Sequence, residues 1–121
     1  MSDNAQVALV NMPFSYSKFP SIQLGTLSAL LKSKGIPVDC HHLNVRFAHT
    51  IGVPLYESIC EKRALFGEWI FSYLLFRDNP KRAQYPRLFK PVFEQVAKES
   101  GHPASFFEEM ASRTAPQFLT W

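Results

Sequence analysis

The first third of the chain alternates between apolar runs and turn signals in the order expected for a small α/β unit. Residues 7–12 (VALVNM) form an unbroken apolar run that ends at a proline, which predicts a strand covered on both faces. Residues 14–20 carry serines and a proline and are predicted to form a loop. From Ser21 to Lys34 the leucines recur at helical spacing, and Gly35 follows as a stop signal. Strand, proline loop and helix in this order are typical of the start of a cofactor-binding α/β sheet.

The pattern continues with one more strand and then becomes helical. Residues 38–45 (VDCHHLNV) are predicted to form a second strand, which completes a βαβ unit over residues 5–48 with a right-handed crossover and parallel strands. In residues 53–121 the apolar positions follow helical spacing, with helices expected over 54–77, 86–100 and 103–114. The predicted fold class is therefore α/β, a partial Rossmann-like βαβ unit followed by a bundle of three or more helices.

Two strands are few for a parallel sheet. Parallel sheets are normally covered on both faces and hold four or more strands, so a pair leaves two edges without a neighbour. We therefore expect residues 1–121 to form a single incomplete domain whose remaining strands come from elsewhere; the alternative is an unusually small sheet. The apolar run at residues 118–121 (FLTW) likewise indicates a segment that needs a docking site.

Composition excludes several classes of protein. The chain has 121 residues, 46% of them hydrophobic, which is enough for a real core. Its net charge of +3 is mild and its basic residues are scattered, which argues against nucleic-acid binding. No signal-peptide pattern or membrane-length apolar run is found, so no membrane association and a cytoplasmic location are expected. Cys40 and Cys60 lack metal-ligand spacing and are expected to be reduced thiols.

Ligands of open α/β sheets lie beyond the carboxyl ends of the strands, so the candidate binding residues follow the two predicted strands. The first helix also presents backbone N–H groups at its start. A structural role remains the alternative for two of these residues: Gly25 would allow close packing of helix on strand, and Asn44 would cap a turn. The candidate cofactor-binding residues are Asn11, Pro13, Phe14, Ser15, Tyr16, Ser21, Gln23, Gly25, Asn44 and Arg46.

Other chemically suggestive residues favour structural roles. His41 and His42 are neighbours on a predicted strand and point to opposite faces, so they are not expected to share a metal ion. Trp69 is expected to pack in the core, and the Glu57–Glu61 pair is expected on a solvated helix face. The sequence contains no P-loop, no Rossmann GxGxxG and no recognisable nucleophile–base pair, so no catalytic residue is assigned.

Short motifs in a characteristic order carry a family resemblance over about residues 7–121. They are residues 11–14 (NMPF), 20–25 (PSIQLG), 42–48 (HLNVRFA) and 66–71 (FGEWIF). In these motifs the chain resembles the amino-terminal part of cobalamin-dependent radical S-adenosylmethionine (SAM) enzymes of the ribosomal peptide (bacteriocin-type) maturation family, several of which are peptide C-methyltransferases. The resemblance implies a Rossmann-like cobalamin-binding domain ahead of a radical SAM barrel with a [4Fe–4S] cluster, and a precursor peptide as substrate.

The chain departs from that family at two motifs. The CxxxCxxC motif that holds the cluster is absent, and no DxHxxG motif is present, because Asn44 stands where its glycine would be. Without the cluster motif, the chain alone is expected to be inactive and to hold no metal. Because the strands that would complete the corrin cradle are missing, it is expected to bind cobalamin weakly or not at all. Two classes of function follow. In the first, the chain is the amino-terminal portion of such an enzyme, with a radical SAM partner or a missing carboxyl-terminal domain; in the second, it is a stand-alone, non-catalytic module that binds a peptide or a partner.

Overall fold

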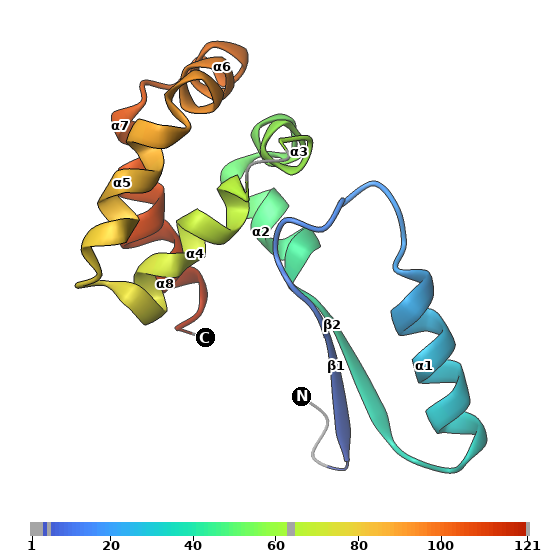
Figure 1. Cartoon of the computed structure of the whole chain (residues 1–121). Coiled ribbons are helices and arrows are strands. Elements are labelled where there is room, and N and C mark those ends of the chain that lie inside the picture. Colours follow the sequence, from blue (N-terminus) through green and yellow to red (C-terminus); the bar gives the residue numbers. More distant parts are fainter. Residues whose placement is uncertain (1–3, 5, 63–64, 121) are drawn as a thin grey trace.

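The chain is mostly helical and carries one small parallel sheet (Figure 1). The structure is a computed structural model, and it describes residues 4, 6–62 and 65–120. Strands β1 (Val7–Asn11) and β2 (Val38–His42) pair in parallel, with Val7 opposite Val38 and Asn11 opposite His42. Helix α1 (Ile22–Ser33) connects them. The predicted order of strand, helix and parallel strand is confirmed.

The second strand is shorter than its predicted extent. It ends at His42, and the chain turns directly into helix α2 (Leu43–Ile51). Leu43 and Phe47, four residues apart, are 5% and 0% exposed, so a helix in this segment buries both on one face. The prediction of strand for residues 43–45 was therefore wrong, because the helical period of the apolar residues extends across them.

After β2 the described chain is mainly helical, as predicted, but the helix boundaries differ from the predicted ones. Residues 54–77 were expected to form one helix and instead contribute to two, with the first ending at Cys60 and the second beginning at Phe66. Pro86 lies inside a helix rather than at its start, and Pro116 occupies a first turn, where the missing N–H costs little. The helices are α3 (Val53–Cys60), α4 (Phe66–Phe76), α5 (Pro80–Leu88), α6 (Lys90–Ser100), α7 (Ser105–Glu109) and α8 (Ala115–Phe118), with a π-helical turn η1 (Met110–Thr114) between the last two.

An aromatic core holds these helices together. Phe66 is fully buried and lies 4.4 Å from Phe93 and 5.2 Å from Phe107, measured between ring centroids. Trp69 is 5% exposed, which confirms its predicted place in the core. Phe118, from the apolar run near the end of the sequence, lies 4.9 Å from the Phe47 ring, so part of that run docks within the chain.

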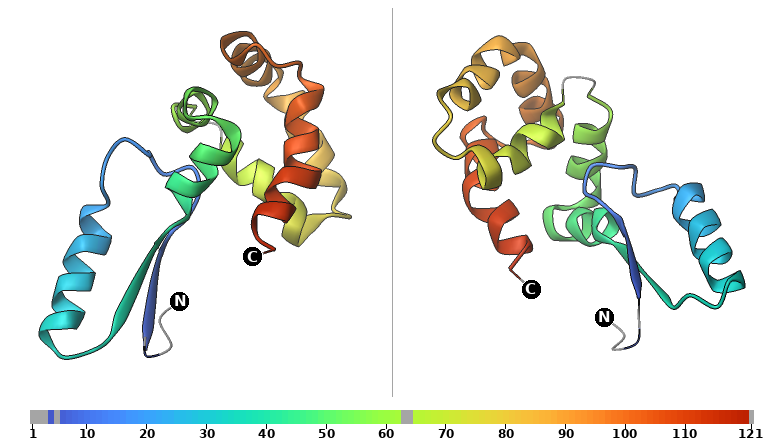
Figure 2. Two further views of the ribbon diagram at one scale, coloured as in Figure 1. Left: turned by 180° about the vertical axis from the view of Figure 1, so that it is seen from behind. Right: turned by 60° about the horizontal axis from the view of Figure 1, so that its bottom comes forward.

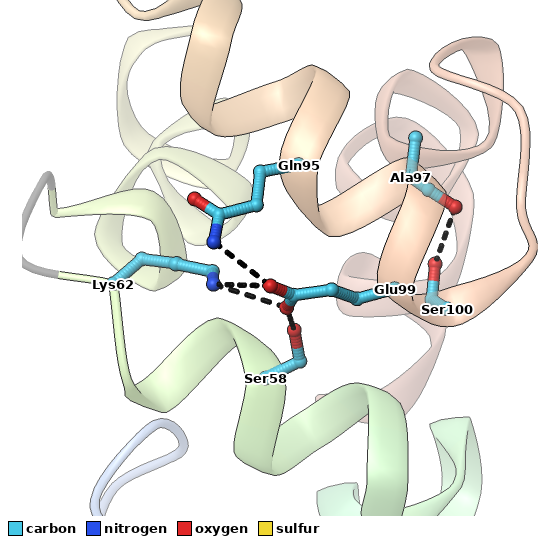
Figure 3. Close-up of polar contacts among 6 residues, drawn as sticks. All are labelled: Ser58, Lys62, Gln95, Ala97, Glu99 and Ser100. Atoms are coloured by element: carbon cyan, nitrogen blue, oxygen red, sulfur yellow. Dashed lines mark hydrogen bonds and ion pairs between the residues drawn. The ribbon is translucent and has the colours of Figure 1, made fainter.

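A polar cluster joins α3 to α6 at the surface (Figure 3). The Glu99 carboxylate accepts hydrogen bonds from the Ser58 hydroxyl at 2.6 Å and the Gln95 amide at 2.8 Å. Lys62 Nζ lies 3.0 Å from the same carboxylate. These bonds hold the pKa of Glu99 below its usual value of 4.5. The Ser58 hydrogen bond lowers it most, followed by the Lys62 hydrogen bond. The cluster fixes α6 against the end of α3.

The sheet is less covered than its sequence predicted. Helix α1 stands on one side of the strands, while the other helices lie beyond their carboxyl ends (Figure 2). Burial alternates along β1, and Val10 is 43% exposed, so the expected coverage of both faces was wrong for the described residues. Ile22 and Leu30 of α1 are also exposed, at 80% and 55%. This part of the molecule keeps unpartnered apolar surface.

Candidate functional site

The loop between β1 and α1 is held in place by α3. Phe14 has a φ of 71°, in the left-handed region, and its N–H donates to the Tyr56 hydroxyl at 2.6 Å. The same hydroxyl donates to the Ser15 carbonyl at 2.6 Å. The Phe14 ring stacks on the Tyr56 ring at 5.3 Å with an angle of 13° between their planes. Tyr56 thus fixes both the backbone and the side chain of the loop.

A buried carboxylate makes the second attachment. Ser17 donates its N–H to Glu57 Oε1 at 3.0 Å, and its hydroxyl donates to the same oxygen. Hydrogen bonds to an ionised acceptor are stronger than those between neutral groups. Glu57 is 6% exposed whereas Glu61 is exposed, so the predicted solvated Glu57–Glu61 face was wrong for Glu57. The loop folds down over α3 and covers that carboxylate.

Asn44 makes the third attachment, from the first turn of α2. It is 2% exposed, and its Nδ2 donates to the Tyr16 carbonyl at 3.3 Å. Its Oδ1 is buried without a hydrogen-bond partner. A buried acceptor left unpaired costs about 1–3 kcal/mol, so an N–H donor from a ligand or a water would be favoured there.

These attachments shape a pocket at the carboxyl ends of the two strands, which we name the strand-end pocket. Its volume is about 290 Å³. A neighbouring hollow of about 450 Å³ between α1 and β2 shares three of its residues, Pro20, Ser21 and His42. The strand-end pocket is lined by Asn11, Ser17, Lys18, Phe19, Pro20, Ser21, His42, Asn44 and Val45.

Three of the candidate binding residues meet in this pocket. Asn11 comes from the end of β1, Ser21 from the start of α1 and Asn44 from α2. Asn44 was predicted to lie near the carboxyl end of the second strand and instead lies in the first turn of α2, because β2 ends two residues earlier. Ser21 also caps α1, accepting from the Leu24 N–H at 3.2 Å.

Ser15 and Tyr16 lie on the loop rather than in the pocket lining. The Ser15 hydroxyl donates to Asn11 Oδ1 at 2.7 Å, and the Tyr16 ring lies 6.3 Å from the Phe19 ring. Pro13 is half-buried in the turn after β1. These residues shape the loop that encloses the pocket.

The remaining candidates lie farther out. Gln23 is exposed in the first turn of α1, and the Arg46 guanidinium lies 5.8 Å from the centre of the Phe118 ring, outside the pocket lining. Gly25 lines the neighbouring hollow, but a Cβ there would meet no heavy atom within 4 Å. The expectation that Gly25 permits close helix–strand packing was therefore wrong.

Sequence reasoning missed the residues of α3 that hold the loop. Tyr56 and Cys60 lie four residues apart on one helix face, and the Cys60 thiol donates to the Phe14 carbonyl at 3.4 Å. Burial, reinforced by the Glu57 charge, raises the pKa of the Cys60 thiol to about 12. Burial also raises the pKa of Tyr56. Both groups stay protonated near neutral pH and act as donors, so this arrangement is suited to positioning a loop and not to nucleophilic attack.

Within the described ranges, no cluster of three His, Cys, Asp or Glu side chains could hold a metal ion, and no helix is long and apolar enough to cross a membrane. Cys40 and Cys60 are both free thiols, as expected. No protein-family model, curated protein or solved structure matches this chain.

Proposed function

We propose that this chain is a cofactor-binding component and not an enzyme by itself. It is the amino-terminal portion of a Rossmann-like, cobalamin-binding domain of a radical SAM enzyme that modifies ribosomally made peptides, with C-methylation as the reaction of the whole enzyme. The observation that carries the proposal is the pocket at the carboxyl ends of β1 and β2, where open α/β sheets bind their ligands. Three residues expected from the sequence, Asn11, Ser21 and Asn44, line it.

The small sheet, with its open edges, supports the proposal that this chain is a portion of a larger domain. In the described part of the chain, β1 and β2 pair only with each other, so each has an outer edge open to a further strand. Val10 and Met12 at the end of β1 are 43% and 53% exposed. Strands of a radical SAM partner, or of a carboxyl-terminal domain, would cover this surface and enclose the pocket from the other side.

The pocket, of about 290 Å³, would receive only one amide-bearing edge of a ligand as large as cobalamin. Its loop is held by Tyr56, Glu57 and Asn44, so little ordering cost remains for binding. Asn44 Oδ1 is an acceptor without a protein partner, and the primary amides on the rim of a corrin supply N–H donors. The role of this chain is to bind and position cobalamin, which supplies the methyl group when bound in the complete enzyme.

Amide-resolved NMR can test this proposal on the chain as it exists. Hydroxocobalamin is titrated to millimolar concentration into ¹⁵N-labelled chain, with SAM as the control ligand. Half a cradle supplies only part of the contacts, so we expect a dissociation constant on the order of 0.1–1 mM. Shift changes are expected at the amides of Asn11, Ser21, Asn44 and Val45, and SAM is expected to leave them unchanged.

A matched pair of variants locates the site. Val45 lines the pocket and is 49% exposed, whereas Val53 is 42% exposed and lies outside the lining. Val45→Arg should fill the pocket and abolish the shift changes, and Val53→Arg should leave them as in the native chain. Unchanged amides in the native chain, or equal responses of the two variants, would refute cobalamin binding at this pocket.

A further inference from the structure

Another hollow lies on the helical body, in the groove between α4 and α5. It shares no lining residue with the strand-end pocket. Its volume is about 550 Å³, and most of its lining is apolar. Leu75 and Phe76 of α4 border it and are 80% and 55% exposed. Large apolar side chains left open to water around a hollow are typical of a surface that a partner covers.

Polar groups with unused donors stand in the wall of this groove. The Arg82 side chain is 9% exposed and lies 5.0 Å from the Trp69 ring centre and 4.6 Å from that of Tyr73. Its Nη1 pairs with Glu108 at 3.2 Å, while Nε and Nη2 have no hydrogen-bond partner. The aromatic rings stabilise the cation but do not accept its remaining N–H groups as well as oxygen would.

The Tyr85 hydroxyl, in the same wall, is also buried without a partner. Burial raises the pKa of Tyr85 to about 12, so the hydroxyl keeps its proton near neutral pH and can donate it in a hydrogen bond. Unpaired buried donors cost about 1–3 kcal/mol each. An oxygen acceptor brought by a partner would recover this energy.

The segment that builds α4 and α5 carries an excess of positive charge, and Lys81 and Arg82 bring two of its basic side chains, beside Glu68, to the groove lining. Residues 65–90 contain five basic and two acidic side chains, whereas the rest of the sequence carries equal numbers of each. The net charge of +3 therefore resides in this segment. A second copy of the chain would bring a segment of the same positive charge against this one, so an acidic partner is favoured over self-association.

We propose that the α4–α5 groove binds a short, acidic, amphipathic peptide segment of a partner protein. Apolar side chains of the peptide cover Leu75 and Phe76, and an Asp or Glu carboxylate accepts hydrogen bonds from Arg82 and the Tyr85 hydroxyl. A peptide fits better than a membrane surface, because the unused donors lie in the wall of a hollow, where a flat bilayer does not reach. This inference is independent of cobalamin binding at the strand-end pocket.

Fluorescence polarisation with designed probes tests the inference. The probe is a labelled 12-residue helical peptide with Leu at positions i, i+3, i+4 and i+7 and Glu at the flanking positions. We expect a dissociation constant on the order of 10–100 μM, weakening with added salt. Replacing every Glu with Gln, or every Leu with Ser, should weaken binding at least about tenfold.

Two exposed leucines give a matched pair of variants. Leu75 lines the groove and is 80% exposed, whereas Leu88 is 75% exposed and does not line it. Leu75→Glu should weaken binding at least about tenfold, and Leu88→Glu should leave it unchanged. Tyr85→Phe should weaken binding severalfold without lowering the melting temperature, because it removes a hydroxyl that has no partner in the free chain.

Three results would overturn the inference. The first is equal binding of the Glu and Gln peptides, or of the two leucine variants. The second is sedimentation of the chain with anionic phosphatidylserine vesicles while the peptide fails to bind, which would point to a membrane surface. The third is concentration-dependent dimerisation that Leu75→Glu abolishes and Leu88→Glu does not, which would assign the groove to a second copy.

Discussion

A single methyl group added at Gly67 should loosen the loop that shapes the strand-end pocket. Gly67 is the second residue of α4, and a Cβ built on it would lie 2.7 Å from the Cβ of Phe14 and closer still to its ring. The ring has little room to withdraw. Tyr56 stacks on it at 5.3 Å, and Phe47 and Phe71 meet it at 5.6 and 5.9 Å. Gly67→Ala therefore forces the loop, the helix or both to move.

The size of the effect follows from two opposing contributions. Overpacking a close-packed site costs about 1–3 kcal/mol. Replacing glycine by alanine in a helix returns up to about 1 kcal/mol through helix propensity. We expect a net loss of about 1–2 kcal/mol in the free energy of unfolding, which for a chain of this size lowers the melting temperature by roughly 4–8 °C.

Thermal unfolding followed by circular dichroism provides the assay, and Gly25→Ala is the matched control. Gly25 also lies in a helix, but a Cβ there meets nothing within 4 Å. Only helix propensity should then act, so the melting temperature should rise by a few degrees, corresponding to about 0.5–1 kcal/mol.

The same substitution in a chain without the Phe14 side chain isolates the contact between residues 67 and 14. Phe14→Gly removes both the ring and the Cβ, and glycine accepts the positive φ of 71° at that position without strain. In this background Gly67→Ala should be neutral or slightly stabilising. The reasoning is refuted if Gly67→Ala raises the melting temperature of the otherwise native chain, or if it costs as much in the Phe14→Gly background as in the native one.

Two further predictions concern ionisable groups. Iodoacetamide at pH 8 should alkylate exposed Cys40 at least about tenfold faster than Cys60, because burial raises the pKa of the Cys60 thiol to about 12. In the urea-unfolded chain the two cysteines should react at equal rates. Equal rates in the folded chain would contradict the structure. Because the pKa of Glu99 is lowered in the folded chain, its ionised carboxylate stabilises the fold at pH values above its usual pKa of 4.5. This stabilisation is lost as the pH falls through the folded-state pKa. Glu99→Gln should therefore lower the urea midpoint at pH 7, with the difference from the native chain narrowing towards pH 3. Glu94→Gln, at an exposed i,i+4 pair with Lys90, serves as the control, and a Glu99→Gln difference that is the same at both pH values would contradict the account.

The first strand and helix could be predicted because local chemistry determines them. Ser21 accepts the Leu24 N–H at the start of α1, and Gly35 takes a φ of 72° just after its end. Both residues act through their own backbone and near neighbours, which the sequence shows directly. The place of the pocket followed from the same order of elements, because parallel strands bring their carboxyl ends to one edge.

The end of β2 and the environment of Glu57 could not be predicted in this way. Residues 43–45 are compatible with strand or helix, and the choice is made by tertiary packing, which buries Leu43 and places Phe47 in the helical core. Glu57 and Glu61 have the spacing of an exposed pair, and only the arrival of Ser17 from 40 residues away distinguishes them. Such contacts depend on tertiary packing, which a periodic pattern does not contain.

The loop shows why the sequence could place the pocket but could not shape it. Between β1 and α1, the hydrogen bonds of Ser15 to Asn11 and Met12 are local, whereas the loop is fixed from outside by Tyr56, Glu57 and Asn44. Each of these three residues is buried and belongs to α2 or α3, and Tyr56 is part of the helical core. The helical body therefore determines the form of the loop between β1 and α1. Its packing, more than the loop sequence, determines whether the pocket keeps its form.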